Sequence, residues 1–397
     1  MPAGLLEGVT VLDLSQGIAG PFCARLLGDY GAEVLKVEPP AGDPLRHTGP
    51  FLHDDPHPEK SLFFLVLNLN KRGITLNLET ALGQRLFLEL VERADVVVES
   101  FPPGYLGRLG LDYPRLAERN PRLVLTSITP FGQTGPYSRF AGEEIVAYAM
   151  SGIMFISGTA DREPLKHGGN QAQYDAGLFG AAATAVALLS ASTTGQGHHL
   201  DISITEVVAS TLVSTLPIYA FMGGVPGRRP PQGTMLANPM PCKDGWVILQ
   251  TGGGATWDDI ADFLGKPELK DARFATTEGR RVHGEEVDAL VLDAIKERGR
   301  WDIFREAARR RILAGIVQDA RDLVECPQLA ARQFYREVEH PVMGRVKVPA
   351  VLCNLSATPY ALRRPAPLLG QHNAEVYCGQ LGYSREDLVR MRQVGAI

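Results

Sequence analysis

The sequence predicts an α/β protein with a parallel sheet, followed by a smaller second unit. Short β-rich runs alternate with segments of helical apolar spacing through the first half, as in "VTVLDLS" followed by "ARLLGDYGA". Strands that alternate with helices form parallel sheets whose faces are covered by those helices. The length of 397 residues exceeds one ordinary core and therefore indicates two domains.

The first half contains four clear strand segments and the helices between them. We expect strands within 9–15, 33–40, 73–80 and 95–101, and a further helix and strand within 116–132. Helices are expected within 17–32 and 81–94, where apolar residues recur at helical spacing. These elements belong to a first domain part that we place at 1–220.

The segment 221–241 is rich in Pro and Gly and predicts a linker. After it, a strand is expected near 244–253, and amphipathic helices are expected at 256–265, 283–298 and 300–311. We assign these to a small domain at 242–332. Strand-like segments return within 344–356, and the chain ends in a predicted helix, so 333–397 is expected to rejoin the large domain.

Composition indicates a reduced, cytoplasmic enzyme. The net charge is −5 without a basic cluster, so nucleic acid is not an expected partner. The apolar stretches are short and interrupted, and the N-terminus lacks a secretory pattern, so no membrane span is expected. The five cysteines are scattered and form no CxxC pair, which predicts neither a disulfide framework nor a metal site.

The stretch "HGGNQAQYDAGLFGAAATAVALL" (167–189) changes from polar to small and apolar at Asp175. A carboxylate near a helix start accepts bonds from free backbone N–H groups and faces the positive end of the helix dipole. Asp175 is therefore expected to start the helix, although a catalytic carboxylate fits the same position. The residue spacing alone does not separate these two roles.

Several segments occur together in an order that resembles the class III CoA-transferases, the family of formyl-CoA transferase, carnitine CoA-transferase and 2-methylacyl-CoA racemase. The segments that carry the resemblance are "GVTVLDLSQGIAGPFCARLLGDYGAEVLKVEPPAGDPLR", "LNLNKRGITLNL", "DVVVESFPPGYLGRLGLDY", "SITPFGQTGP", "AGLFGAAATAVALL", "TGQGHHLDISITEV" and "DGWVILQTGGGATW". The resemblance implies a Rossmann-like large domain, an inserted small α+β domain and an interlocked dimer.

The resemblance also implies a chemistry. Family transferases use an Asp carboxylate that attacks the acyl-CoA thioester and forms an anhydride, and carboxylates suit this because their acyl derivatives pass the group on. That Asp precedes the glycine of "AGL" by four residues, and here this position is Gln173. Asp175 lies two residues later, or roughly 200° around a helix. The resemblance implies no covalently bound cofactor. It implies a coenzyme A thioester as substrate.

Other departures affect family ligand positions. Arg in the family's "ERPGGD" and "ENFRPG" patterns is replaced by Pro39 and Pro102, the usual Gln before "AGP" is Ile18, and the racemase His is Glu143. Candidate residues for a CoA contact are Lys71, Arg72 and Arg139. The glycines of "TGGGATW", Gly252, Gly253 and Gly254, stand where the family has a loop that closes over the intermediates.

These observations favour one function and leave two alternatives. The favoured one is the non-catalytic subunit of a heteromer similar to succinyl-CoA:benzylsuccinate CoA-transferase, with a related Asp-bearing subunit as partner in a heterodimer or heterotetramer. That partner would bind most of the CoA. The first alternative is a self-sufficient CoA-transferase that uses Asp175 or Glu143. The second is a non-enzymatic binding or regulatory homologue.

Overall fold

The computed structural model describes residues 4–228, 238–250 and 254–397, in two compact units. The first unit contains residues 1–157, 164–226 and 331–397, and the second contains 158–163 and 227–330. Part of the predicted linker, residues 229–237, lies outside the described residues. Its first two residues belong to a helix that ends at Met222, 223–228 form a loop, and a strand begins at Met240.

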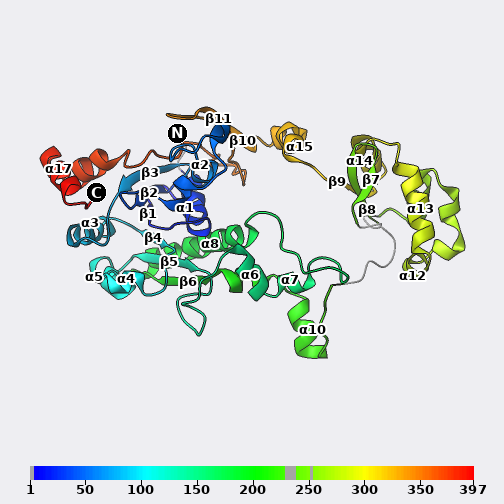
Figure 1. Cartoon of the computed structure of the whole chain (residues 1–397), viewed down its shortest axis with the longest axis horizontal. Helices are drawn as coiled ribbons and strands as arrows, with labels where there is room; N and C mark the ends of the chain where they lie inside the picture. Colours follow the sequence, from blue (N-terminus) through cyan, green and yellow to red (C-terminus); the bar gives the residue numbers. More distant parts are fainter. Residues whose placement is uncertain (1–3, 229–237, 251–253) are drawn as a thin grey trace. The chain divides into compact units, whose positions relative to one another are not determined.

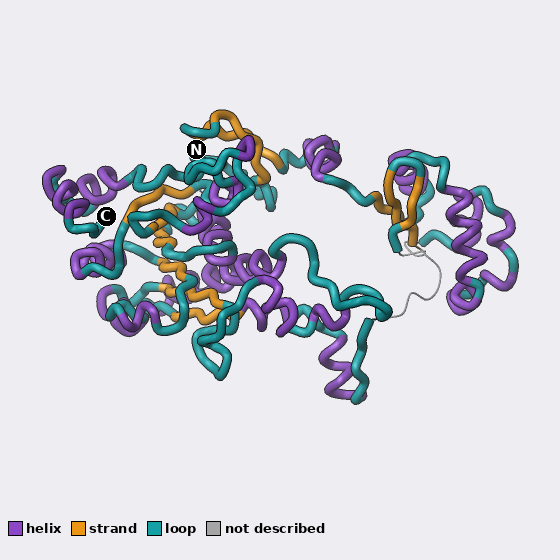
Figure 2. Tube along the Cα trace, viewed as in Figure 1, coloured by secondary structure: helices purple, strands orange, loops and turns teal. Residues whose placement is uncertain are grey.

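A six-stranded parallel sheet forms the centre of the first unit, as the sequence predicts (Figures 1 and 2). Its strand order is β3-β2-β1-β4-β5-β6, the order of a doubly wound Rossmann sheet. The strands are β1 (Thr10–Asp13), β2 (Glu33–Glu38), β3 (Lys71–Thr75), β4 (Val96–Glu99), β5 (Val124–Thr129) and β6 (His199–Ser203). Strands β2 and β3 extend the sheet on one side of β1, and β4, β5 and β6 extend it on the other side. The strand order therefore reverses between β1 and β4.

Helices cover both faces of this sheet. On one face, α1 (Ala19–Asp29) and α8 (Gln171–Thr194) pack together over Val11, Val96 and Val124. On the other face, a second core joins Leu12, Leu35 and Val97 to three helices, namely α3 (Ala81–Val91), α5 (Tyr113–Arg119) and α17 (Arg385–Gln393). Alternation of side chains along each strand distributes the apolar residues between these two cores.

Shorter helices complete the first unit. They are α2 (Leu62–Leu67), α4 (Tyr105–Arg108), α6 (Glu144–Met150), α7 (Ile153–Ile156), α9 (Ile204–Ser210), α10 (Thr215–Met222) and a π-helix at Ala374–Gln380. The returning C-terminal part contains the hairpin β10 (Tyr335–His340) and β11 (Gly344–Pro349), whose strands pair with each other and not with the main sheet.

The second unit has its own antiparallel sheet of β7 (Met240–Cys242), β8 (Gly245–Gln250) and β9 (Leu313–Ile316). Its helices are α11 (Trp257–Leu264), α12 (Thr277–Val282), α13 (Gly284–Ile295), α14 (Arg300–Arg309), α15 (Ala320–Glu325) and α16 (Pro327–Ala331). A separate apolar core that includes Val247, Ile260 and Val291 joins the sheet to α11, α13 and α14.

Helix α8 is long and apolar enough, by length and composition, to cross a membrane, and the bent pair α9–α10 meets the same criterion. One face of α8 is nevertheless packed into the core beside α1, where Ala176 and Gly177 are buried. The sequence predicted no membrane span because its apolar stretches are short and interrupted. Of the apolar window of α8, 39% is buried inside the structure, and Val186 and Leu189 on α8 are exposed.

Candidate active site

A pocket of about 220 Å³ lies at the carboxyl end of the parallel sheet, where the strand order reverses between β1 and β4. We call it the central pocket. Ligands of open α/β sheets bind at this topological position because the loops after the two strands diverge there. Its lining residues are Gln16, Gly17, Ala19, Ser100, Ile128, Pro130, Gly142, Glu143, Glu144, Ala147, Gln173 and Ile204.

Buried ions fix the loop that follows β1. Asp13 pairs with Lys71 at 2.7 Å, and its carboxylate also accepts bonds from the backbone N–H and the hydroxyl of Ser15. Lys36 donates to the Ser15 carbonyl and pairs with Asp43 at 2.7 Å. Burial opposes ionisation of Asp13, but the two lysines outweigh it and lower the pKa of that carboxyl. The backbone just before Gln16 is therefore held from two sides.

The N-terminus of α8 is stabilised by a residue from another helix. Both Glu144 carboxylate oxygens accept backbone N–H bonds, from Ala172 at 3.0 Å and from Gln173 at 3.2 Å. The prediction that Asp175 starts this helix is wrong. The helix begins at Gln171, so Asp175 lies a full turn inside it and is exposed. The preceding glycine-rich loop accounts for the error, because it lets the helix begin earlier than the apolar pattern does.

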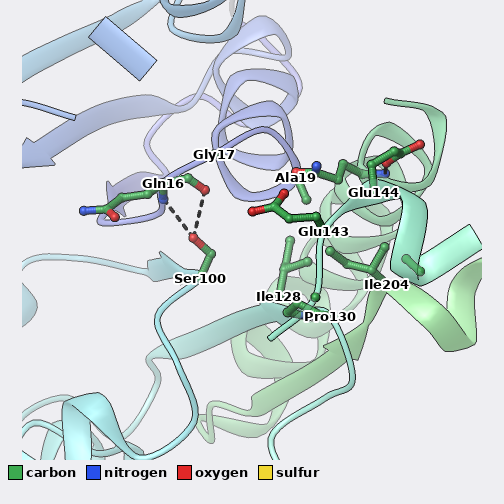
Figure 3. Close-up of a pocket in the computed structure, with 12 residues that line it drawn as sticks. Gln16, Gly17, Ala19, Ser100, Ile128, Pro130, Glu143, Glu144 and Ile204 are labelled. Atoms are coloured by element: carbon green, nitrogen blue, oxygen red, sulfur yellow. Dashed lines mark hydrogen bonds between the residues drawn. The ribbon is translucent and has the colours of Figure 1, made fainter. Parts of the chain in front are cut away.

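Gln173 and Glu143 are brought to the same pocket, whereas Asp175 is not among its lining residues. A Cβ on Gly17 would lie 3.8 Å from the Gln173 side-chain oxygen, which places that amide beside the β1 loop. Figure 3 shows the Glu143 carboxylate turned into the pocket, while Glu144 extends away from it. The pocket thus contains an amide and a carboxylate that face the loops after β1 and β4.

A second pocket of about 690 Å³, the loop pocket, shares Ser100, Pro130, Gly142 and Glu143 with the first. Its other lining residues are Phe101, Pro102, Pro103, Thr129, Ser138, Arg139, Phe140 and Ala141. The Thr129 hydroxyl is buried here without a hydrogen-bond partner among the described residues. The two pockets together offer an extended, partly apolar surface that is suited to a long ligand with a reactive end.

Comparisons with known proteins identify the family. The sequence model described as CoA-transferase family III matches residues 6–373. The chain is 36% identical to succinyl-CoA–D-citramalate CoA-transferase of Chloroflexus aurantiacus, with 98% of each chain covered. It is 32% identical to the BbsE subunit of succinyl-CoA:(R)-benzylsuccinate CoA-transferase of Thauera aromatica, with 97% of each covered. A CaiB/BaiF family protein from Brucella suis superposes with a TM-score of 0.86 at 32% identity, covering 96% of this chain and all of that one.

The chain belongs to CoA-transferase family III. Members of this family of enzymes transfer CoA between acyl-CoA and carboxylic acids. The agreement extends over nearly the whole chain, so the resemblance inferred from its motifs is confirmed at the level of the family.

Two of the three cations that the family resemblance proposed for CoA are engaged elsewhere. Lys71 is fully buried and bonded to Asp13, and burial lowers its pKa to about 8, so it is a structural cation and not a ligand contact. Arg72 pairs with Glu375 at 2.7 Å and lines neither pocket. Arg139 does line the loop pocket and makes no ion pair within the described parts of the chain.

The positions where the family has arginine are both at the carboxyl edge of the sheet. Pro39 directly follows β2, and Pro102 lies three residues after the end of β4 and lines the loop pocket. Gly252 and Gly253 of the family's glycine loop lie outside the described residues. Gly254 is described and has a left-handed φ of +98°, a conformation that favours glycine.

Three residues that the motifs did not single out contribute to this site: Glu99, Ser100 and Glu144. Ser100 joins the two loops at the strand-order reversal, and Glu144 caps α8. In the sequence, only their positions could have indicated a role in the site. Glu99 and Ser100 lie at the end of a predicted strand, and Glu144 follows a loop that contains a glycine. Among the residues that the structure describes, no cluster of His, Cys, Asp and Glu could hold a metal ion.

Proposed function

We propose that this chain is the subunit of a heteromeric family III CoA-transferase that does not supply the nucleophile. The observation that carries the proposal is Gln173, which lines the central pocket at the position where the family resemblance expects the nucleophilic Asp. A carboxamide cannot form the acyl anhydride or the enzyme-bound CoA thioester through which CoA passes to the acceptor. Asp175 does not replace it, because it lies outside the pocket and points to solvent.

A large exposed apolar surface supports the need for a partner subunit. Val186 and Leu189 on α8 are more than two-thirds exposed, and Phe221 and Met222 on α10 are about four-fifths exposed or more. Exposed apolar patches of this kind mark protein interfaces. The proposed partner is a related chain that carries the Asp, assembled with this one as a heterodimer or heterotetramer in the cytoplasm.

The proposed donor is a dicarboxylic acyl-CoA such as succinyl-CoA, and the acceptor is a carboxylic acid. Relatives named for succinyl-CoA-dependent transferases support this choice. This chain's own contact with CoA is proposed to be Arg139 in the loop pocket. Proline at positions 39 and 102 removes two charge-assisted contacts, each worth about 1.5–3 kcal/mol, so the partner is expected to bind most of the CoA.

A self-sufficient transferase that uses Glu143 is the second candidate. The observation that favours it is the Glu143 carboxylate in the central pocket (Figure 3). A glutamate carboxylate can form the same anhydride as an aspartate. This candidate needs no second chain, so it predicts a different result in the following experiment.

The experiment measures transfer of CoA from succinyl-CoA to a panel of carboxylic acids. The purified chain is tested alone and after co-expression with an Asp-bearing relative encoded beside it. The proposal predicts no transfer by the chain alone and transfer by the assembled pair, with Glu143→Gln leaving an active pair. Transfer by the chain alone that Glu143→Gln abolishes would instead establish the second candidate.

The substitution Gln173→Asp is expected not to create a transferase by itself. Two lost charge-assisted contacts weaken CoA binding by on the order of a hundredfold or more, and remote binding energy also helps to position the thioester. The triple variant Gln173→Asp, Pro39→Arg, Pro102→Arg is the appropriate comparison. Transfer with wild-type CoA affinity by the single variant would show that the CoA site was intact throughout.

A further inference from the structure

The hydroxyl of Ser100 connects the two loops that form the floor of the central pocket. It accepts the Gln16 backbone N–H at 2.8 Å and donates to the Gln16 carbonyl at 2.9 Å (Figure 3). Gln16 lies beyond the end of β1, and Ser100 lies directly after β4. A single side chain therefore continues the pairing of β1 and β4 past the point where their own backbone bonds stop.

The neighbouring Glu99 fixes the start of the loop that follows β4. Its carboxylate accepts the Phe101 backbone N–H at 2.6 Å, and its side chain is nearly inaccessible to solvent. Phe101 lines the loop pocket, and Ser100 lines both pockets. Ser100 thus holds the β1 loop at Gln16, and Glu99 holds the β4 loop at Phe101.

We propose that Ser100 and Glu99 are positioning residues that control ligand binding in both pockets. Ser100 sets the separation of the β1 and β4 loops, and Glu99 fixes the path of the β4 loop at Phe101. The proposal uses coenzyme A as its probe and rests on the proposed function only for that reason. Neither residue needs to touch the ligand. Their effect is transmitted through the Gln16 and Phe101 backbone groups that they hold.

The ionisation of Glu99 should make hydrogen exchange at Phe101 depend on pH. A purely structural role of Glu99 predicts no such dependence. Burial raises the pKa of Glu99 to about 7, against the opposing effect of bonds from Ser127 and the Phe101 N–H, and the nearby Asp201 raises it further. An ionised acceptor holds an N–H roughly twice as strongly as a neutral one. The Phe101 bond is therefore expected to weaken as the pH falls from 8 to 6.

Other titratable groups face Glu99 and must be separated from it. Asp201 on β6 lies opposite Ser127 in the sheet, and the His199 ring bonds the Ser127 hydroxyl at 2.9 Å. Tyr113 of α5 stacks on that ring at 5.6 Å. His199 is also titratable, and burial lowers its pKa, so a His199→Gln variant is required beside Glu99→Gln.

The first experiment tests Ser100. Hydrogen exchange of the peptides that contain Gln16 and Phe101 is measured by mass spectrometry, together with CoA affinity by calorimetry. Ser100→Ala leaves two backbone groups unpaired, so faster exchange at Gln16 and roughly tenfold weaker CoA binding are expected. Ser100→Thr, which keeps a hydroxyl, is expected to restore both. Ser192→Ala, an exposed serine on α8, serves as the matched control.

The second experiment compares the wild type, Glu99→Gln and His199→Gln at pH 6 and pH 8, with Glu118→Gln as an exposed control. After correction for intrinsic exchange, the Phe101 peptide of the wild type is expected to exchange about fivefold faster at pH 6. That difference should disappear in Glu99→Gln and persist in His199→Gln.

Each outcome decides the proposal. Unchanged exchange and affinity in Ser100→Ala, or an unchanged pH dependence in Glu99→Gln, would overturn it. A wild-type chain that binds no CoA would count against the proposed CoA contact at Arg139, and the exchange measurements would still decide whether the two residues hold the loops.

Discussion

At the scale of single residues, buried ion pairs stabilise the fold only while both partners are present. Arg46 is fully buried. Its guanidinium donates two hydrogen bonds to Glu38, at 2.6 and 2.7 Å, and one to Glu59, at 2.6 Å. Removing one partner of a buried pair leaves a charge without compensation. Arg46→Met is therefore expected to lower the free energy of unfolding by about 3–5 kcal/mol, measured by chemical denaturation.

A matched control for that variant is Arg108→Met. Arg108 pairs with Glu79 at 2.9 Å, but both side chains are about half exposed or more. Exposed ion pairs contribute about 0–1 kcal/mol because water screens them. Equal losses from Arg46→Met and Arg108→Met would show that the Arg46 pair contributes no more to stability than a surface pair.

Glu99 is expected to make stability depend on pH in the opposite sense to a salt-bridged carboxylate. Burial raises its pKa in the folded state from 4.5 to about 7, so between these values the folded protein holds a proton that the unfolded chain releases. The protonated Glu99 carboxyl therefore adds to the free energy of unfolding below pH ~4.5, and this contribution is lost as the pH rises through about 7. Glu99→Gln should gain on the order of 3 kcal/mol relative to wild type between pH 5 and pH 8, measured as unfolding free energy at both values. A constant difference between the two proteins would contradict the assignment.

At the scale of elements, the close contact of α1 and α8 depends on glycine. A Cβ on Gly177 would lie 2.5 Å from the Ala19 carbonyl oxygen and 3.1 Å from the Phe22 ring. Gly177→Ala must therefore push the helices apart, at an expected cost of about 1–3 kcal/mol. Gly107→Ala in α4, where the nearest atom is 3.9 Å away, should be neutral or slightly stabilising. Thermal unfolding distinguishes the two, and a neutral Gly177→Ala would mean that the helices can separate freely.

Most elements could be predicted from local pattern, but not their pairing. The segments of α3, α11 and α14 match the predicted helices because their apolar residues recur at helical spacing. Strand β3 begins at Lys71, before the predicted 73–80, because its first side chain is an ion-paired lysine that interrupts the apolar pattern. The strand order and the separate β10–β11 hairpin depend on contacts between distant residues, which periodicity does not contain.

The site was predictable only in part for the same reason. The family resemblance identified Gln173 and Glu143, and the structure brings both to one pocket. Lys71 was misassigned because a basic residue in a sequence does not reveal a buried carboxylate 58 positions away. Ser100 escaped notice because its role depends on the distant Gln16 backbone.

At the scale of the whole molecule, the exposed apolar surface of α10 predicts an obligate assembly. Phe221 is 88% exposed, and a charge placed there should be incompatible with a buried interface. In the chain co-expressed with its Asp-bearing partner, Phe221→Asp is expected to shift the assembly from an oligomer to monomers in light scattering at micromolar concentration. Val389→Asp, on an exposed face of α17, should leave the assembly unchanged. A well-folded wild-type monomer at that concentration would argue against the proposed partner subunit.

The most direct test of the account is to trap the acyl-enzyme. The chain alone, and separately the chain assembled with an Asp-bearing relative, is incubated with succinyl-CoA, treated with hydroxylamine or borohydride, and mapped by mass spectrometry. The account predicts a modified aspartate on the partner and no modification of this chain, including its Gln173 and Glu143 peptides. A hydroxamate or an alcohol at Glu143 of the chain alone, formed only with succinyl-CoA, would contradict it and would establish this chain as a transferase in its own right.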